Sequence, residues 1–182
     1  MNHKYFEENI EGSKMSKKSP SRDNFEINKD DMSSVHIAVV AAKWNSNITD
    51  NLIKGAQFVL KNSGIPEKNI DIYRVPGAFE LPFACQKLTN VQKLPSYNGI
   101  IALGCVIRGE TPHFDYICQE TTRGLGEVVL RANIPVGYGL LTTDDLAQAE
   151  QRSHIEINSA LGQSNKGQDA ADAVLEMIHT FS

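Results

Sequence analysis

The sequence predicts an α/β protein in which a central, mostly parallel four-stranded sheet is covered by helices on both faces. Two observations support this fold class. Short apolar runs rich in β-branched residues alternate along the chain with longer segments whose apolar residues recur at helical spacing. The short runs are also continuously apolar, which is typical of strands that are buried on both faces. A length of 182 residues favours a single domain.

Each predicted element has its own signal. The strands are expected at 35–41, 70–75, 99–107 and 135–141, and the helices at 48–60, 77–88, 113–132 and 167–180. The pair Ser63-Gly64 is a usual helix end, so the first helix is expected to stop there. Pro82 is tolerated only in the first turns of its helix, where its missing N–H is not needed. Residues 142–144, Thr-Thr-Asp, predict the start of a further helix.

The first 34 residues differ from the rest of the chain. They hold six basic and seven acidic side chains, several serines and few large apolar residues. A segment that buries little apolar surface does not offset its own chain entropy, so we expect a disordered extension over 1–34 and a folded unit over 35–182. A short apolar alternation at Phe25 and Ile27 is a candidate edge strand that would extend the sheet on assembly.

Composition argues against several kinds of partner. The chain has 18 Lys+Arg against 22 Asp+Glu, a net charge of −4, so neither a nucleic acid nor an anionic membrane is an expected partner. No apolar run approaches the roughly 18 residues of a membrane span, and the first residues lack the apolar region of a signal peptide. The three cysteines, Cys85, Cys105 and Cys118, are expected to be free thiols in a reducing compartment, which predicts a cytoplasmic location.

Several signatures of cofactor or metal chemistry are missing from the sequence. There is no phosphate-binding P-loop, no dinucleotide fingerprint, no His/Cys pair at metal-ligand spacing and no nucleophile elbow. These absences disfavour metal, nicotinamide and acyl-enzyme chemistry.

The unusual side chains of this sequence follow the predicted strands, at the point where each strand ends. The four strand ends carry 43–45, 75–80, 106–113 and 141–144. Because the carboxyl ends of parallel strands meet at one edge of a sheet, next to helix N-termini that attract anions and hydroxyls, a ligand site is expected at that edge.

Residue types alone leave the roles of these side chains open. Trp44 is either a packing residue or an exposed stacking face for a planar ring. Gly77 is either an ordinary turn residue or a point where a ligand approaches the backbone, and Glu80 either caps its helix or accepts ligand hydroxyls. His113 is either solvated or a proton shuttle, and Arg152 is either a favourable cation at a helix end or a phosphate clamp.

Four segments together carry a resemblance to a known family. They are the W-N pair at 44–45, V-P-G-A-F-E-L-P at 75–82, A-L-G-C-V-I-R-G-E-T-P-H-F-D-Y at 102–116 and P-V-G-Y-G-L-L-T-T-D at 135–144. In this order they resemble lumazine synthase, the enzyme of riboflavin biosynthesis that makes 6,7-dimethyl-8-ribityllumazine. The match runs from about Val35 to Met177.

The resemblance implies a fold and a reaction. The fold is a flavodoxin-like three-layer αβα sandwich, assembled into homopentamers whose active sites are shared between neighbours. The reaction condenses 5-amino-6-(D-ribitylamino)uracil with 3,4-dihydroxy-2-butanone 4-phosphate and releases phosphate and water, without a metal or an organic cofactor.

The resemblance also implies roles for individual residues. His113 matches the proton-transfer residue, and Trp44 the aromatic that stacks on the pyrimidinedione. The contacts to the ribityl chain fall on Ala78, Phe79 and Glu80, and those of the strand end beside the heterocycle on Cys105, Val106 and Ile107. Glu110 and Thr111 match the phosphate-side loop, Arg152 the phosphate clamp, and Tyr138 an aromatic that a neighbouring subunit receives at its site.

One segment departs from the family pattern. Lys166 of the N-K-G sequence follows Arg152 by 14 positions, which is longer than the compact family turn. This spacing leaves open whether Lys166 contacts substrate. The same turn is associated in the family with closing pentamers into an icosahedral shell, so the extension favours free pentamers or a pair of pentamers.

Three other functions stay open at this stage. They are a non-catalytic flavin- or lumazine-binding protein on the same scaffold, a shell-forming protein whose catalysis is incidental, and a flavodoxin-like FMN binder.

Overall fold

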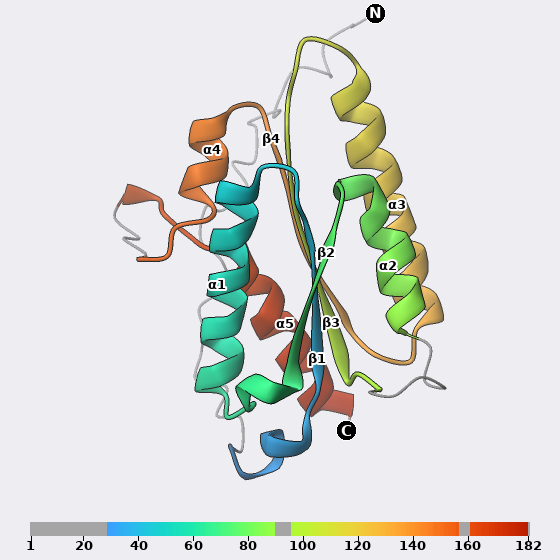
Figure 1. The fold of residues 1–182 in the computed structure, drawn as a ribbon, viewed down its shortest axis with the longest axis vertical. Coiled ribbons are helices and arrows are strands. Elements are labelled where there is room, and N and C mark those ends of the chain that lie inside the picture. The colour runs from blue at the N-terminus through green and yellow to red at the C-terminus, as the bar shows by residue number, and fades with distance from the viewer. Residues whose placement is uncertain (1–28, 90–95, 157–160, 182) are drawn as a thin grey trace, which may run out of the picture.

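A four-stranded, entirely parallel sheet forms the centre of the computed structural model, which describes residues 29–89, 96–156 and 161–181. The strand order is β2-β1-β3-β4, and the two most buried strands, β1 and β3, lie in the middle. Figure 1 labels the four strands. The strands are β1 (Ile37–Ala42), β2 (Ile70–Val75), β3 (Gly99–Ile107) and β4 (Val136–Thr143). All four predicted strands are confirmed to within two residues at each end.

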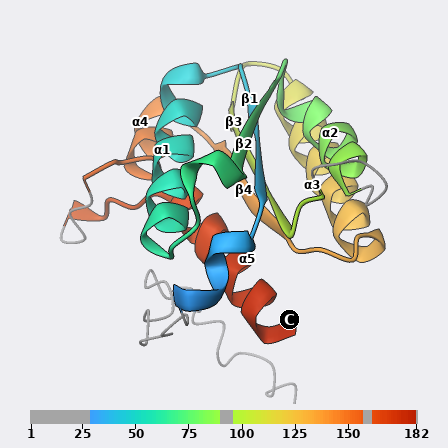
Figure 2. The same cartoon turned by 60° about the horizontal axis from the view of Figure 1, so that its bottom comes forward.

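Helices cover both faces of the sheet. Figures 1 and 2 show one layer built from α1 (Ser46–Asn62), α4 (Leu146–Gln151) and α5 (Lys166–Phe181). The opposite layer contains α2 (Leu81–Leu88) and α3 (His113–Arg131). This three-layer arrangement confirms the predicted flavodoxin-like αβα fold.

The core is divided by the sheet into two apolar clusters. Every residue of β1 is buried, because its alternate side chains point to opposite helical layers. Val39 packs into the cluster under α1 and α5, and Val40 into the cluster under α2 and α3. Burying one such side chain stabilises the folded state by about 1.5–3 kcal/mol. The central strands therefore give the carboxyl edge of the sheet a stable position.

Two helix starts differ from the predictions. The second helix was expected from residue 77, but a 3-10 turn, Ala78–Glu80, comes first and α2 begins at Leu81. Pro82 therefore lies in the first turn of α2, where its missing N–H removes no hydrogen bond of the helix. The Thr-Thr-Asp segment was expected to start a helix, but β4 continues to Thr143, which is paired with the end of β3. Asp145 caps α4 instead, and its carboxylate accepts a hydrogen bond from the backbone N–H of Gln148.

Regular structure also precedes Val35, the expected start of the folded unit. A 3-10 helix, Lys29–Ser34, precedes β1, and Met32 within it is buried in the core. The side-chain amide of Asn69 donates to the backbone carbonyls of Ser33 and Val35, which anchors this segment to the folded part. The candidate edge strand at Phe25 and Ile27 lies outside the described residues.

A narrow backbone contact closes the segment between α4 and α5. Ser153 and Asn165 form an antiparallel bridge, and the N–H of Lys166 donates to the carbonyl of Arg152 at 2.9 Å. Lys166 and Arg152 are therefore neighbours along this backbone contact, although 14 positions separate them in the sequence.

Asn165 fixes the start of α5. Its side-chain oxygen accepts from the N–H groups of Gly167 and Gln168, and its side-chain amide donates to the carbonyls of Asn51 and His154. Asn165 is only 1% exposed, so these bonds satisfy a polar group that water does not reach.

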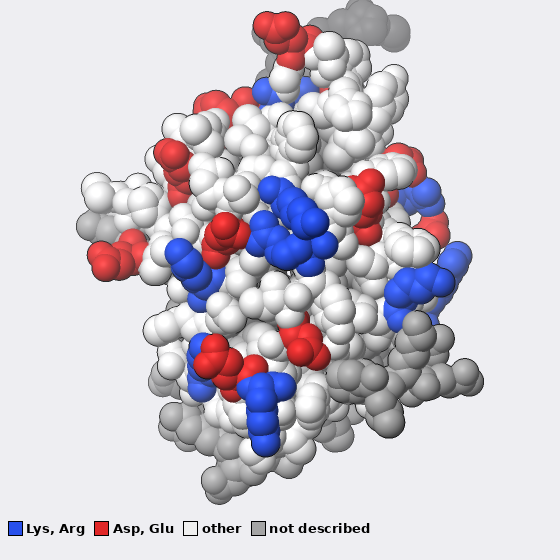
Figure 3. All heavy atoms as spheres, in the orientation of Figure 1, with Lys and Arg blue, Asp and Glu red and all other residues white. Residues whose placement is uncertain are grey.

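Charged side chains of both signs occupy the face seen in Figure 1. Figure 3 shows acidic and basic groups interspersed there, with a small basic group near the centre. Within the described ranges, no helix combines the length and the hydropathy that a membrane crossing requires.

Candidate active site

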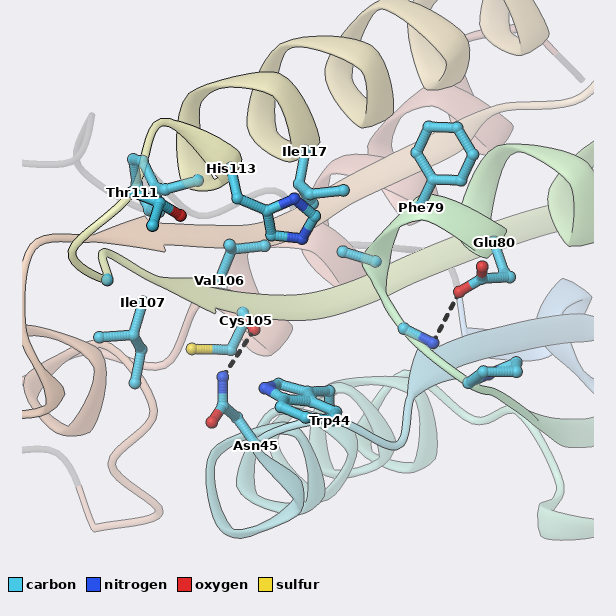
Figure 4. A pocket seen from close by; sticks show the side chains of 15 residues that line it. Trp44, Asn45, Phe79, Glu80, Cys105, Val106, Ile107, Thr111, His113 and Ile117 are labelled. Atoms are coloured by element: carbon cyan, nitrogen blue, oxygen red, sulfur yellow. Dashed lines mark hydrogen bonds between the residues drawn. The ribbon is translucent and has the colours of Figure 1, made fainter.

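A pocket of about 470 Å³ opens at the carboxyl edge of the sheet. Three strand ends build it: the β1–α1 turn, the turn after β2 with the 3-10 turn Ala78–Glu80, and the segment from the end of β3 into α3. Figure 4 shows Trp44 and Asn45 on one side, Thr111, His113 and Ile117 on the other, and the end of β3 between them. The volume lies within the range of small-molecule sites, so the pocket is large enough for a ligand of that size.

Most of the residues that the sequence singled out line this pocket. They are Trp44, Ala78, Phe79, Glu80, Cys105, Val106, Ile107, Thr111 and His113. Glu110, Tyr138 and Arg152 do not line it in the isolated chain. The lining also includes Asn45, Pro76, Gly77, Gly109, Phe114 and Ile117. Neither Phe114 nor Ile117 was a predicted site residue; their nearness to the N-terminus of α3 was the signal that could have placed them in the pocket.

Trp44 is not a core packing residue. Its side chain is 73% exposed and lines the pocket (Figure 4). The adjacent Asn45 has left-handed backbone angles, φ 55° and ψ 50°, and its side-chain amide donates to the carbonyl of Cys105 at 2.9 Å. This turn therefore presents a large aromatic surface beside the end of β3.

Glu80 caps its own turn and still faces the pocket. Its Oε2 atom accepts a hydrogen bond from the N–H of Gly77 at 2.8 Å, so the capping alternative is correct (Figure 4). A carboxylate accepts about four hydrogen bonds, and a single cap leaves capacity for ligand hydroxyls. Capping the turn and accepting ligand hydroxyls are therefore compatible roles for Glu80, and the cap holds the carboxylate in a fixed position.

Arg108 fixes the loop that leads into α3. Its guanidinium donates to Asp144 Oδ1 at 3.0 Å and to both carboxylate oxygens of Asp115, at 3.1 and 3.3 Å, and lies 4.1 Å from the ring centroid of Phe114. The hydrogen bond to Asp144, together with the Asp115 carboxylate, raises the pKa of Arg108. Its N–H also donates to the carbonyl of Thr143. The loop carrying Thr111 and His113 is thus tied to the end of β4.

The cysteine at the pocket is a poor nucleophile. Burial raises the pKa of the Cys105 thiol to about 12, so the thiol stays protonated at neutral pH. Burial likewise raises the pKa of Cys85 to about 12, and that of Cys118 is raised by burial and by Asp115. All three thiols are free. Cys105 is therefore not a thiolate nucleophile at neutral pH.

The remaining predicted residues lie outside the pocket lining. Arg152 ends α4, where its Nη1 atom donates to the carbonyl of Gln148 at 2.9 Å, as a cation at a helix end does. Lys166 pairs with Asp169 at 2.7 Å. Tyr138 on β4 is 47% exposed, and its hydroxyl lies 2.8 Å from that of Thr122. Glu110 is exposed in the loop before α3.

Metal-ligating side chains do not gather in the described part of the chain. No group of three or more His, Cys, Asp or Glu residues suited to a metal ion occurs among residues 29–89, 96–156 and 161–181.

The fold and the pocket define a class: flavodoxin-like α/β proteins that bind a small molecule at the carboxyl edge of a parallel sheet. The family model for 6,7-dimethyl-8-ribityllumazine synthase matches residues 34–182. The chain therefore belongs to the 6,7-dimethyl-8-ribityllumazine synthase family.

Individual relatives support this assignment along nearly the whole folded unit. The chain is 46% identical over 151 residues to the 6,7-dimethyl-8-ribityllumazine synthase of Desulfovibrio desulfuricans, covering 83% of this chain and 91% of the relative. It is 42% identical over 149 residues to the enzyme of that name from Parabacteroides distasonis, covering 82% and 88%. A third, from Nautilia profundicola, is 43% identical over 145 residues, covering 80% and 88%.

Proposed function

We propose that this chain is a transferase that condenses 5-amino-6-(D-ribitylamino)uracil with 3,4-dihydroxy-2-butanone 4-phosphate to give 6,7-dimethyl-8-ribityllumazine. Imine formation and ring closure each release water, and an elimination step between them releases phosphate. The observation that supports this function best is a single pocket lined by both Trp44 and His113, the stacking and proton-transfer positions of the family motifs. Nothing in the structure favours the non-catalytic alternative.

The pocket offers a surface for each part of the first substrate. Trp44 stacks on the planar pyrimidinedione, and the backbone at Cys105, Val106 and Ile107 meets the edge of the ring. Glu80, held by its cap to Gly77, accepts hydrogen bonds from the ribityl hydroxyls, next to Ala78 and Phe79. This places the reacting amine toward the side of the pocket where His113 lies.

His113 handles the protons of the reaction. It is the first residue of α3 and lies across the end of β3 from Trp44 (Figure 4). Each step moves a proton among nitrogen, carbon and oxygen, so one imidazole serves several steps in turn. The two substrates react with each other readily, so much of the acceleration comes from positioning them.

A homopentamer with shared active sites accounts for the residues outside the pocket. Tyr138 and Arg152 do not line the pocket described above, and that pocket is open, with Trp44 73% and Phe79 58% exposed. We therefore assign Tyr138 and Arg152 to the pocket of the neighbouring subunit. There the guanidinium of Arg152 donates hydrogen bonds to the phosphate of the second substrate, beside Glu110 and Thr111.

The long connection between Ser153 and Asn165 favours free pentamers or a pair of pentamers over a closed shell. Among its described residues, Ile155 is 50% and Leu161 65% exposed. Sedimentation equilibrium is expected to give five chains of 20.1 kDa, 100.5 kDa in all, or twice that mass. A particle of about sixty chains would contradict this proposal. The free thiols fit a reducing compartment, and we place the enzyme in the cytoplasm.

The function is tested by following lumazine absorbance with both substrates present. Wild-type protein is expected to turn over, and His113→Ala to lower kcat about tenfold with little change in KM, because the reaction loses its proton carrier but keeps its positioning. The matched control is His36→Ala, since His36 precedes β1 at the opposite edge of the sheet. Unchanged turnover in His113→Ala would remove the proposed role of His113, and an inactive wild type would favour a binding protein.

A further inference from the structure

The turn after β1 contains an unusual backbone conformation. Within the ranges that the structure describes, Asn45 is the only residue other than glycine with a positive φ. Residues held in this region are uncommon and tend to persist where the surrounding structure fixes them for a functional reason. Asparagine tolerates the left-handed region better than most residues, so the residue type fits the conformation. The question is what holds it there.

The side chain of Asn45 does not take its usual part at a helix start. Asn45 is the N-cap residue of α1, and its backbone carbonyl accepts from the N–H groups of Ile48 and Thr49. An asparagine at this position ordinarily also caps with its side chain, but among the described residues no such bond is formed. The amide instead donates to the carbonyl of Cys105, a residue 60 positions away at the end of β3.

This hydrogen bond spans two of the three strand ends that build the pocket. Figure 4 shows the amide of Asn45 directed at the strand end, with Trp44 beside it at the edge of the cavity. Trp44 is 73% exposed, so packing on its own chain restrains it little. The position of its ring therefore depends on the backbone of the turn, and that backbone is held by Asn45.

We infer that Asn45 is a positioning residue: its amide, bonded to the Cys105 carbonyl, holds the β1–α1 turn so that the Trp44 ring lines the pocket beside the end of β3. The inference rests on the proposed stacking role of Trp44. The left-handed backbone and the missing side-chain cap of Asn45 are both unfavourable, and the placement of the Trp44 ring explains why they persist.

The chain offers a direct probe of this role. Trp44 is the only tryptophan, so tryptophan fluorescence and its anisotropy report on this ring alone. Asn45→Gly keeps the left-handed backbone accessible and removes the amide, whereas Asn45→Asp keeps the shape and replaces the donor with an acceptor. The matched control is Asn98→Ala, which removes a single hydrogen bond from the N–H of His36 far from the pocket.

Both Asn45 variants are expected to lower the tryptophan anisotropy and to raise KM for ribitylaminouracil about fivefold, the loss of one hydrogen bond. The KM for the butanone phosphate and kcat stay within about twofold, because the imidazole and the phosphate contacts are untouched. Measurements are made well below the melting temperature of each variant. Asn98→Ala is expected to match wild type in every one of these readouts.

Two results would overturn the inference. One is wild-type anisotropy and wild-type KM in Asn45→Gly and Asn45→Asp, and the other is a lowered melting temperature as the sole change. The proposed function is tested separately, by quenching of wild-type Trp44 fluorescence on addition of 6,7-dimethyl-8-ribityllumazine. Absence of quenching in wild type contradicts the stacking role, whereas wild-type quenching with no effect of Asn45 contradicts the positioning role alone.

Discussion

Replacing Gly167 with alanine is expected to lower the free energy of unfolding by about 3 kcal/mol, at the upper end of overpacking effects. Gly167 is the second residue of α5, where that helix crosses α1. A Cβ atom there would lie 2.0 Å from the carbonyl oxygen of Leu52 and 2.7 Å from its carbonyl carbon. Both are backbone atoms, so no side chain can rotate to relieve the overlap and the two helices must move apart.

The matched control is Gly126→Ala in the exposed part of α3. An added Cβ at Gly126 meets nothing within 4 Å, so alanine there is expected to stabilise the protein by about 0.5–1 kcal/mol through its lower chain entropy. Urea unfolding followed by circular dichroism, at one fixed protein concentration, compares the two. Equal midpoints for the two variants would show that the α1–α5 contact is not as tight as the structure has it.

Arg152→Ala is expected to raise KM for 3,4-dihydroxy-2-butanone 4-phosphate about a hundredfold, while KM for the other substrate changes little. A guanidinium donates two parallel hydrogen bonds to a phosphate, and alanine removes both together with the charge. Arg123→Ala serves as the control, because Arg123 forms ion pairs with the exposed carboxylates of Glu120 and Glu127 on α3. Steady-state kinetics with each substrate varied in turn give both constants.

Mixed oligomers decide whether Arg152 acts across the subunit boundary. Arg152→Ala and His113→Ala chains are unfolded together in equal amounts and refolded. If each pocket takes His113 from one chain and Arg152 from the next, random assembly restores both residues at about a quarter of the sites. If both residues serve the pocket of their own chain, no site regains both. Activity no higher than the mean of the parent variants would contradict the shared site.

The fold was predictable because its strongest signals are local. β1 and β3 are buried on both faces, so each reads as an unbroken apolar run bounded by polar residues. The pocket was predictable in outline for a related reason: in a parallel sheet, each strand end automatically brings its loop to the same edge. Trp44, Glu80 and His113 each follow a different strand and line one cavity.

The rest of the site depends on contacts between residues far apart in the sequence. Nothing local to Asn45 indicates that its amide reaches the carbonyl of Cys105. The bond between Arg108 and Asp144 likewise joins two loops that no periodicity relates. The start of α2 was predicted four residues early because apolar spacing cannot distinguish a 3-10 turn from the first turn of an α-helix.

Because the bridge joins Ser153 to Asn165, the connection between these two residues can differ in length among natural or designed variants. The hydrogen bond from Lys166 to Arg152 and the cap that Asn165 provides are made at the ends of this connection. They therefore do not depend on how many residues it contains. The entropic cost of a longer loop also grows only slowly, about 0.6 kcal/mol for each doubling. A foreign peptide inserted there would be displayed once per subunit, with the helices and the cations at its base left in place.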